Sequence, residues 1–415
     1  METRCSSVGL FEEAAQQIEK GLWPREVVET RQPIVAVLCN LTPLEIVHAA
    51  GAVPVRLCAG AIAGPERSES NSAFRIPHSA FLEAPRDLCQ VVKGAAVRLK
   101  ALRRQTGRPP LAVIVPATCD WKAQCCGFLG LSDDTRVLDV PRDRSSPRAR
   151  RQWRKQVAEL ADFLGERTGT PVRRASLLRS VALYQQATRL GRQLAELMKQ
   201  PDPPISGSDL MLAFNMFYNL PVESWIAAAA SLLEELWRRL PTCEKALSPA
   251  GEGDRLPICP TRLLLVGAPI IWPNWWLPRL VESLGGAIVA DALCSSLRGF
   301  SDLASVDETT RPALIEALAD RYLLPCTCPC FVPNEEYLWR IENQIADYRI
   351  EGAIIHRLRN CYLFDIEATR LEELFGRRGI PHLQVESDYE SPASGALTTR
   401  LEAFLELVRE QRGIP

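Results

Sequence analysis

The chain has 415 residues, a formal net charge of -1 and a charged fraction of 24%. This length exceeds one ordinary domain, and the balanced charge gives no overall attraction to nucleic acid or to an anionic membrane. No apolar run reaches the roughly 20 residues that a membrane-spanning helix needs, and the N-terminal residues lack the pattern of a secretory signal. We therefore expect a cytoplasmic protein of more than one domain.

Residues 1–150 predict an N-terminal helix and a first α/β region. Helical apolar spacing marks the segment 11–22 as a surface helix. Apolar runs predict strands at residues 33–38, 53–57 and 111–116. Thr42, Pro43 and Glu45 predict a helix with a capping box directly after the first strand. A stretch rich in proline and arginine, 141–154, is expected to close the region.

Two further segments follow, a helical one at 151–255 and a second α/β region at 256–415. The middle helices are predicted at residues 175–198, 210–218 and 223–240. The second α/β region has predicted strands at 263–266, 287–290, 352–355 and 382–385, and predicted helices at 276–284, 312–323, 334–347 and 366–375. Because alternating strands and helices produce parallel sheets with right-handed crossovers, we expect two α/β domains of similar organisation.

Fourteen cysteines are many for a chain of this kind, and several of them follow predicted strands. Those just past strand ends are Cys39, Cys58, Cys119, Cys294 and Cys361. In open α/β sheets, ligands bind in the crevice at the carboxyl ends of the strands. In a long cytosolic chain, metal binding or redox chemistry is more common than disulfides. We therefore expect thiolates from several strands to converge on one soft metal centre.

The remaining cysteines carry weaker signals. Cys326, Cys328 and Cys330 alternate in a segment that prolines keep out of helical conformation, so we expect them to point the same way. Cys125 and Cys126 are expected inside a helix. The cysteines without a partner signal, interpreted as structural or incidental, are Cys5, Cys243 and Cys259.

Several common binding motifs are absent from the sequence, and their absence narrows the kinds of site that the chain can form. No G-x-G-x-x-G follows a strand and no G-x-x-x-x-G-K-[ST] occurs, so the chain shows no nucleotide-binding loop of its own. No C-x-x-C pair occurs, which argues against zinc ribbons, thioredoxin-like pairs and ferredoxin-type runs. A metal site must then be assembled from distant positions. An iron–sulfur cluster suits thiolate ligands, and zinc is the alternative.

Two residues outside the cysteines are candidates for proton transfer. His356 stands just after a predicted strand and near Cys361, and Glu386 follows the last predicted strand into the same crevice. Each has a structural alternative, a core histidine for the first and a solvated loop for the second.

Three tryptophans and the scattered arginines leave two interpretations open. One interpretation is that the tryptophans line a substrate pocket or shield a metal cluster; the other is that they pack in the core or at a subunit interface. The three tryptophans are Trp272, Trp275 and Trp276. Arginines such as Arg298 are expected to be solvated.

Several ordered motifs point to a known family. They are Cys39–Glu45, Ala49–Pro54, Pro85–Cys89, Thr118–Lys122, Ser206–Asp209, Gly267–Ile270, Cys328–Cys330 with Pro333–Glu335, Cys361 and Glu386–Tyr389. With these motifs the chain, from about Pro33 onward, resembles the 2-hydroxyacyl-CoA dehydratase and benzoyl-CoA reductase superfamily. The resemblance implies two flavodoxin-like domains with an iron–sulfur cluster between them.

The resemblance also implies ligands. By position, Cys39, Cys89 and Cys361 are expected to hold a [4Fe–4S] cubane. A branch of the family with extra cysteines holds a sulfide-bridged double-cubane [8Fe–9S] cluster through six thiolates. This chain is similar to that branch because it contains Cys58, Cys294 and the pair Cys328 and Cys330. The second set of ligands is then expected to be Cys119, Cys294 and either Cys328 or Cys330.

The function that the resemblance implies is an iron–sulfur reductase that acts on a small-molecule substrate. Its electrons come from an ATP-hydrolysing iron–sulfur activator, and the protein is a homodimer. The alternative is the [4Fe–4S] subunit of a 2-hydroxyacyl-CoA dehydratase or benzoyl-CoA reductase, paired with an unlike subunit. A non-catalytic electron carrier, and an α/β protein with buried free thiols, are further alternatives.

Overall fold

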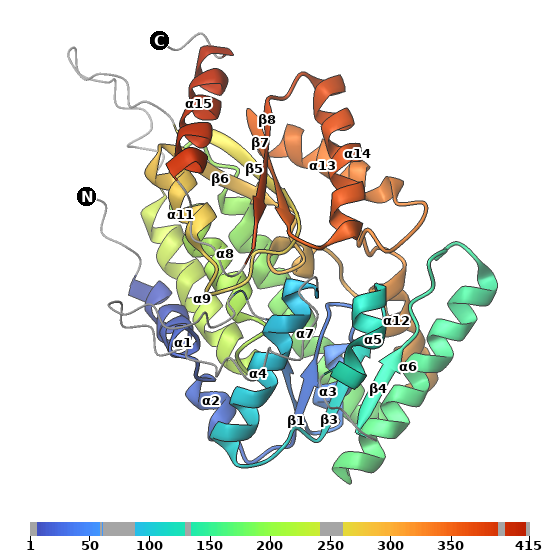
Figure 1. Cartoon of the computed structure of the whole chain (residues 1–415). Coiled ribbons are helices and arrows are strands. Elements are labelled where there is room, and N and C mark those ends of the chain that lie inside the picture. Colours follow the sequence, from blue (N-terminus) through green and yellow to red (C-terminus); the bar gives the residue numbers. More distant parts are fainter. Residues whose placement is uncertain are drawn as a thin grey trace.

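The structure is a computed structural model that describes residues 6–58, 60, 88–128, 134–240, 260–388 and 395–411, without the side chains of 126–128. Eight strands form two sheets within this part of the chain, and helices surround both (Figure 1). None of the described helices has both the length and the apolar character needed to cross a bilayer.

The first sheet is parallel, with the strand order β2-β1-β3-β4. Its strands are β1 (Ile34–Val37), β2 (Val53–Arg56), β3 (Ala112–Pro116) and β4 (Thr135–Leu138). The first three were predicted. The edge strand β4 was not, because it has only four residues and two of them, Arg136 and Val137, are exposed.

The second sheet repeats this arrangement, with the order β6-β5-β7-β8. Its strands are β5 (Thr261–Gly267), β6 (Gly286–Asp291), β7 (Gly352–Leu358) and β8 (His382–Ser387). In both sheets the first strand lies between the second and third, which is the flavodoxin-like order. The predicted two-domain α/β class is confirmed. In such sheets the strand order reverses between β1 and β3 and between β5 and β7, where ligands bind.

Helices supply the remaining regular structure. They are α1 (Gly9–Glu19), α2 (Arg25–Val28), α3 (Leu44–Ala49), α4 (Gln90–Thr106), α5 (Asp120–Phe128), α6 (Pro147–Thr168), α7 (Arg174–Leu197), α8 (Gly207–Met216), α9 (Val222–Arg239), α11 (Trp276–Ser283), α12 (Arg311–Leu323), α13 (Glu335–Asp347), α14 (Tyr362–Arg378) and α15 (Gly395–Gln411), with short 3-10 turns η1 (Ser6–Val8) and η3 (Leu297–Phe300). The sequence did not predict α4, α6 or α15.

The proline- and arginine-rich stretch contains the start of helix α6. Ser146 caps α6 by accepting a hydrogen bond from the Ala149 amide, and Pro147 occupies the first turn. Arg154, inside this stretch, pairs with Asp320 of α12. The stretch therefore joins the first α/β half to the second.

The predicted capping box after β1 is wrong. Helix α3 begins at Leu44, and the buried Thr42 hydroxyl has no hydrogen-bond partner within the described part of the chain. Instead the hydroxyl of Tyr322 accepts from the Leu44 amide at 3.2 Å and donates to Glu45 at 2.8 Å. A side chain from the other half of the molecule thus caps this helix.

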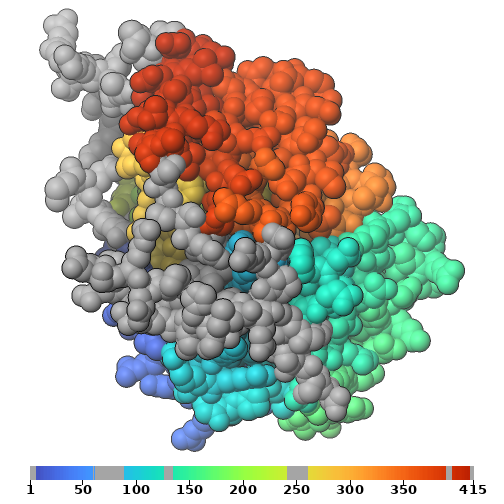
Figure 2. All heavy atoms as spheres, viewed as in Figure 1, coloured from blue at the N-terminus to red at the C-terminus, as the bar shows by residue number. Residues whose placement is uncertain are grey.

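The middle helices connect the two halves. Helix α7 packs on α3 and α9, while α6 packs on α12, and one hydrophobic core runs through all of them. The space-filling view shows the second half, from α13 to α14, lying directly against the α5–α6 region of the first half (Figure 2). The limits 1–150, 151–255 and 256–415 stay predictions.

Candidate metal centre

The cysteines of both sheets lie at carboxyl ends of strands or at the starts of helices. Cys39, Cys58 and Cys119 follow β1, β2 and β3, and Cys294 and Cys361 follow β6 and β7. Every cysteine whose side chain the structure describes is a free thiol. Cys125 is buried in the core and has a packing role, while Cys5, Cys243, Cys259 and the side chain of Cys126 lie outside the described residues.

Three of these thiols share a position at the start of a helix. Cys89 and Cys361 are the residues that precede the first turns of α4 and α14, and Cys119 directly precedes α5. We call Cys89, Cys119 and Cys361 the helix-start triad. Amide groups at a helix N-terminus favour a thiolate over a thiol.

The members of the helix-start triad are close enough to affect one another electrostatically. Burial is the main cause that raises the pKa of Cys89, and charge on Cys119 raises it further. Burial likewise raises the pKa of Cys361, with added contributions from Cys89 and Cys119. Three thiolates this close together repel one another, so they need a cationic partner to ionise together.

A second group comes from loops. Burial raises the pKa of Cys39, and charges on Cys328 and Cys294 raise it further. We call Cys39, Cys294 and Cys328 the loop triad. The resemblance places Cys39 with Cys89 and Cys361, and that grouping stays a prediction. The thiols whose charges act on Cys39 include Cys294 and Cys328.

Lys122 of α5 connects the two triads. Burial alone lowers its pKa, but charges on Cys39, Cys119, Cys58 and Cys328 outweigh that effect and raise the pKa well above its usual value. Its ammonium group donates to the Thr118 hydroxyl at 3.0 Å. The lysine therefore lies between thiols of both triads.

The segment from Cys326 to Cys330 is turned rather than extended. The amide of Phe331 donates to the Cys328 carbonyl, which closes a turn. A hydrogen bond from the Cys330 thiol, together with nearby Arg298 and Lys122, lowers the pKa of Cys328 to about 6 despite burial. Cys330 is itself 2% exposed, and its pKa is raised because it donates that hydrogen bond and is buried. Cys328 is the readier thiolate of the pair.

Two arginines complete a set of cations around the thiols. Arg56 is 6% exposed and donates to the Cys294 carbonyl at 3.2 Å, with its other terminal nitrogen 4.0 Å from the Cys294 sulfur. Arg298 is half-buried and donates to the Thr327 carbonyl at 3.3 Å, so the expectation that it is solvated is wrong. Within the described residues, Arg56, Lys122 and Arg298 form no ion pair with a carboxylate.

Unpaired cations at a buried site require an anion. A charge moved out of water is costly unless an opposite charge neutralises it. The charges that act most strongly on these cations are those of thiols. Thiols supply negative charge when they are deprotonated and bind metal. The donor set, free sulfurs with cations beside them, therefore fits an anionic iron–sulfur cluster.

Cys58 is a thiol that the ligand predictions left out. Its sulfur lies 3.2 Å from the Leu38 carbonyl, and charges on it act on Arg56, Arg98 and Lys122. The sequence already contained a signal for this residue, because Cys58 follows a short apolar run just as Cys39 does.

No three side chains of His, Cys, Asp or Glu are placed to hold one metal ion in the part of the chain that the structure describes.

The two proton-transfer candidates lie inside strands rather than after them. His356 is 2% exposed in β7, and its ring nitrogens lie 2.8 Å from the Ala268 carbonyl and 2.7 Å from the Ser387 hydroxyl. Burial lowers its pKa to about 4. Glu386 is exposed in β8 and pairs with Arg359 at 3.4 Å. These contacts connect residues at the ends of neighbouring strands. No described contact joins His356 or Glu386 to the thiols.

The tryptophans favour the packing interpretation. Trp272 and Trp275 are both buried, their ring centroids are 5.6 Å apart, and the Trp272 indole donates to the Ala15 carbonyl at 2.7 Å. Trp276 begins α11 and is partly buried.

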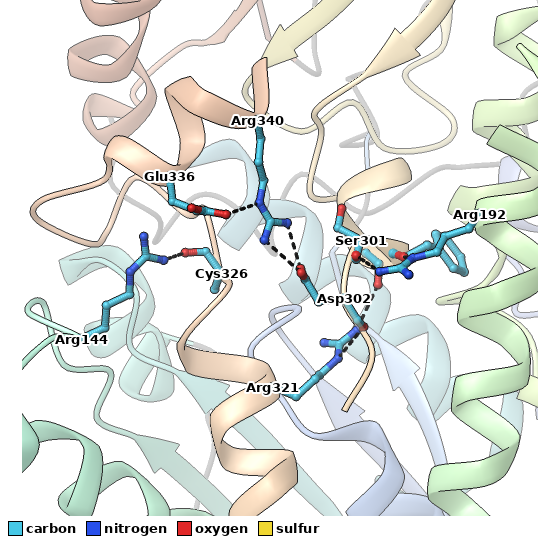
Figure 3. Close-up of polar contacts among 10 residues, drawn as sticks. Arg144, Arg192, Ser301, Asp302, Arg321, Cys326, Glu336 and Arg340 are labelled. Carbon is cyan, nitrogen blue, oxygen red and sulfur yellow. Dashed lines mark hydrogen bonds and ion pairs between the residues drawn. The ribbon is translucent and has the colours of Figure 1, made fainter. Parts of the chain in front are cut away.

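Arginines from three helices fix the segment that follows Cys294. Arg340 forms two hydrogen bonds with the Asp302 carboxylate, at 2.9 and 3.0 Å, and one with Glu336 (Figure 3). Arg321 donates to the backbone carbonyl of Asp302, and Arg192 to that of Ser301. On the other side Arg144 donates to the Cys326 carbonyl. The loops that carry Cys294 and Cys328 are therefore held by guanidinium groups.

Comparison with known proteins gives two matches. The family model described as "2-hydroxyglutaryl-CoA dehydratase, D-component" matches residues 39–408. A protein of Escherichia coli (strain K12) described as "Putative dehydratase subunit YjiM" is 25% identical over 405 residues, which cover 96% of this chain and 98% of that protein. The family match runs from the residue that follows the first strand region into α15, and so includes parts of both sheets and the helices between them.

Proposed function

Because the chain belongs to the 2-hydroxyglutaryl-CoA dehydratase D-component family, we propose that it is an iron–sulfur enzyme of the double-cubane type that reduces a small molecule. The observation that carries the proposal is a set of three cations, the buried Arg56 and the partly buried Lys122 and Arg298. Charges on thiols act on all three, and none forms an ion pair with a carboxylate within the described residues. When bound, such a cluster supplies one-electron transfer at low potential.

We propose that the helix-start triad holds one cubane and the loop triad the other. Three thiols in each group match the three ligands expected for each cubane of an [8Fe–9S] cluster. Cys328 is the proposed ligand of its pair, because Cys330 donates a hydrogen bond to it. Cys330 then acts as a neighbour that stabilises the thiolate.

The cations have a defined role in this proposal. They neutralise negative charge that several thiolates and sulfides bring into the interior, and hydrogen bonds and charge around sulfur set the reduction potential. Lys122 acts on thiols of both triads, while Arg56 and Arg298 act on the loop triad.

The electron source is proposed to be a partner protein. The sequence contains no nucleotide-binding loop, so ATP hydrolysis belongs to an activator that carries its own cluster. The double-cubane type further implies that two copies of this chain form the enzyme.

A second candidate is a [4Fe–4S] subunit of a 2-hydroxyacyl-CoA dehydratase. The family description and the printed name of the Escherichia coli relative favour it. The two candidates differ in metal content. We expect about eight irons per chain for the double-cubane protein and about four for the dehydratase subunit.

The test is iron and acid-labile sulfide analysis of protein isolated without oxygen, with an EPR spectrum of the reduced form. Cys119→Ser and Cys294→Ser each change one triad. Under the double-cubane proposal both variants lose iron, and Cys330→Ser retains it. A colourless, iron-free protein from anaerobic isolation would refute the proposal and its alternative together.

A further inference from the structure

A cavity of about 350 Å³ has Arg298 and Thr327 in its lining. It is bounded by α7, the end of β6, η3 and α13, so it lies at the carboxyl edge of the second sheet. Its charged lining includes four basic side chains, Arg192, Lys199, Arg298 and Arg340. A cavity of this size is at the lower end of the range for small-molecule sites, about 300–1,000 Å³.

Three of the four basic side chains are already engaged. Arg340 is paired with Asp302 and Glu336, and Lys199 with Glu196 and Asp347. Arg192 donates to the carbonyls of Phe300 and Ser301. These side chains shape the walls of the cavity.

Arg298 is different. Its one described hydrogen bond goes to the Thr327 carbonyl, and within the described residues no carboxylate lies within ion-pair distance of it. A guanidinium has five N–H donors in a planar fork that matches a carboxylate. Most of these donors therefore remain for a ligand in the cavity.

The same arginine is next to the thiols. Thr327, which it binds, stands between Cys326 and Cys328 in the chain. Charges on Cys294 and Cys328 outweigh the effect of burial and raise its pKa. A ligand held by Arg298 is thus adjacent to the loop triad.

The acidic lining does not cancel this charge. The carboxylate of Asp291 accepts from the amides of Leu293 and Leu297, at 3.0 and 3.3 Å, and from the Ser296 hydroxyl at 2.7 Å. These donors lie in its own turn, so Asp291 organises the end of β6. The charge of Arg298 acts on the carboxylates of Asp291 and Glu367 but forms no ion pair with either in the described part of the chain, so its guanidinium remains available to a ligand.

We propose that this cavity binds the substrate, a short free carboxylic acid, with its carboxylate on Arg298. The inference rests on the proposed function and adds a substrate class to it. A short acid fits within a cavity of about 350 Å³ with its carboxylate on Arg298. A non-catalytic electron carrier needs no such cavity.

The test is calorimetric titration of the anaerobically isolated protein with acetate, glycolate and malonate, and separately with coenzyme A and acetamide. At least one of the three acids is expected to saturate a single site, while acetamide and coenzyme A do not. Arg298→Gln is expected to weaken that binding about tenfold or more, because a charge-assisted hydrogen bond is lost. Arg279→Gln, on the exposed surface over Trp272, is the matched control and retains full affinity.

A second variant separates binding from any damage to the thiols. Asn343 lines the cavity from the exposed side of α13, away from the cysteines, so Asn343→Trp is expected to weaken binding while iron content stays unchanged. Absence of saturable binding by all three acids below about 10 mM would overturn the inference. Equal affinities in wild type, Arg298→Gln and Asn343→Trp would overturn it as well. If the wild type binds an acid but holds no iron, the proposed function fails and the cavity assignment stands.

Discussion

Arg56, the last residue of β2, donates a 3.2 Å hydrogen bond to the carbonyl of Cys294, which follows β6 in the other α/β half. Its guanidinium also lies 4.6 Å from the centroid of the Tyr218 ring, between the middle helices α8 and α9. One buried cation thus contacts all three segments of the chain at the candidate metal centre.

Replacing this charge is expected to change the reduction potential of the centre. Arg56→Gln removes a positive charge beside Cys294, so adding an electron becomes less favourable and the potential falls by on the order of 50 mV. An EPR-monitored redox titration of the anaerobic protein measures the shift. Arg56→Lys is the control, since it retains the charge but lacks the planar fork, and its potential is expected to stay closer to that of the wild type. An unchanged potential in Arg56→Gln with full iron content would contradict a role for this charge.

The pairing of Asp302 with Arg340 is expected to matter for stability. Asp302→Ala removes two hydrogen bonds to a guanidinium that is only partly exposed, and we expect a loss of about 1–2 kcal/mol in the free energy of unfolding. Urea denaturation measures the loss. Glu336→Ala removes a single contact of the same arginine from a more exposed position and is expected to cost less than about 1 kcal/mol. Equal losses in the two variants would show that the two-bond geometry adds nothing.

The buried histidine predicts a specific pH dependence of stability. Folded His356 stays neutral down to about pH 4, whereas in the unfolded chain it takes up a proton below about pH 6.5. Its contribution is complete above pH 6.5 and is lost as the pH falls toward 4, by up to about 3 kcal/mol. Chemical denaturation at pH 7 and pH 4 of wild type and His356→Gln checks this. The wild type is expected to lose more stability between the two pH values, and parallel losses would contradict the prediction.

The sequence predicted most of the fold because its strands are short apolar runs followed by helical spacing. Strand β4 was not predicted because its exposed residues break the apolar pattern. Helix α6 was not predicted because arginine and proline dominate its first turns. The cap of α3 was wrong for another reason. Tyr322 is 277 residues away from Glu45, and no local pattern reveals a cap from such a distance.

The candidate site was predictable to a similar extent. Cysteines at strand ends can be read from the sequence, since parallel strands share one carboxyl edge. The division into two triads that we propose was not predictable, because it depends on how the two sheets face each other. The same holds for Lys122 and Arg56, which look like ordinary surface cations until the fold buries them beside thiols.

The end of β5 leaves no room for a side chain, which gives a last prediction. Gly267 has φ +105°, and an added Cβ would lie 2.2 Å from the carbonyl oxygen of His356 in the neighbouring strand. Gly267→Ala is therefore expected to cost more than about 3 kcal/mol, because both the backbone conformation and the close approach of β7 oppose it. Gly376 in α14 is the matched control, since nothing lies within 4 Å of its added Cβ and alanine favours a helix. Gly376→Ala is expected to stabilise the protein by about 0.5–1 kcal/mol, and thermal denaturation of the two variants gives the comparison. A mild effect of Gly267→Ala would mean that β5 and β7 separate more easily than their pairing indicates.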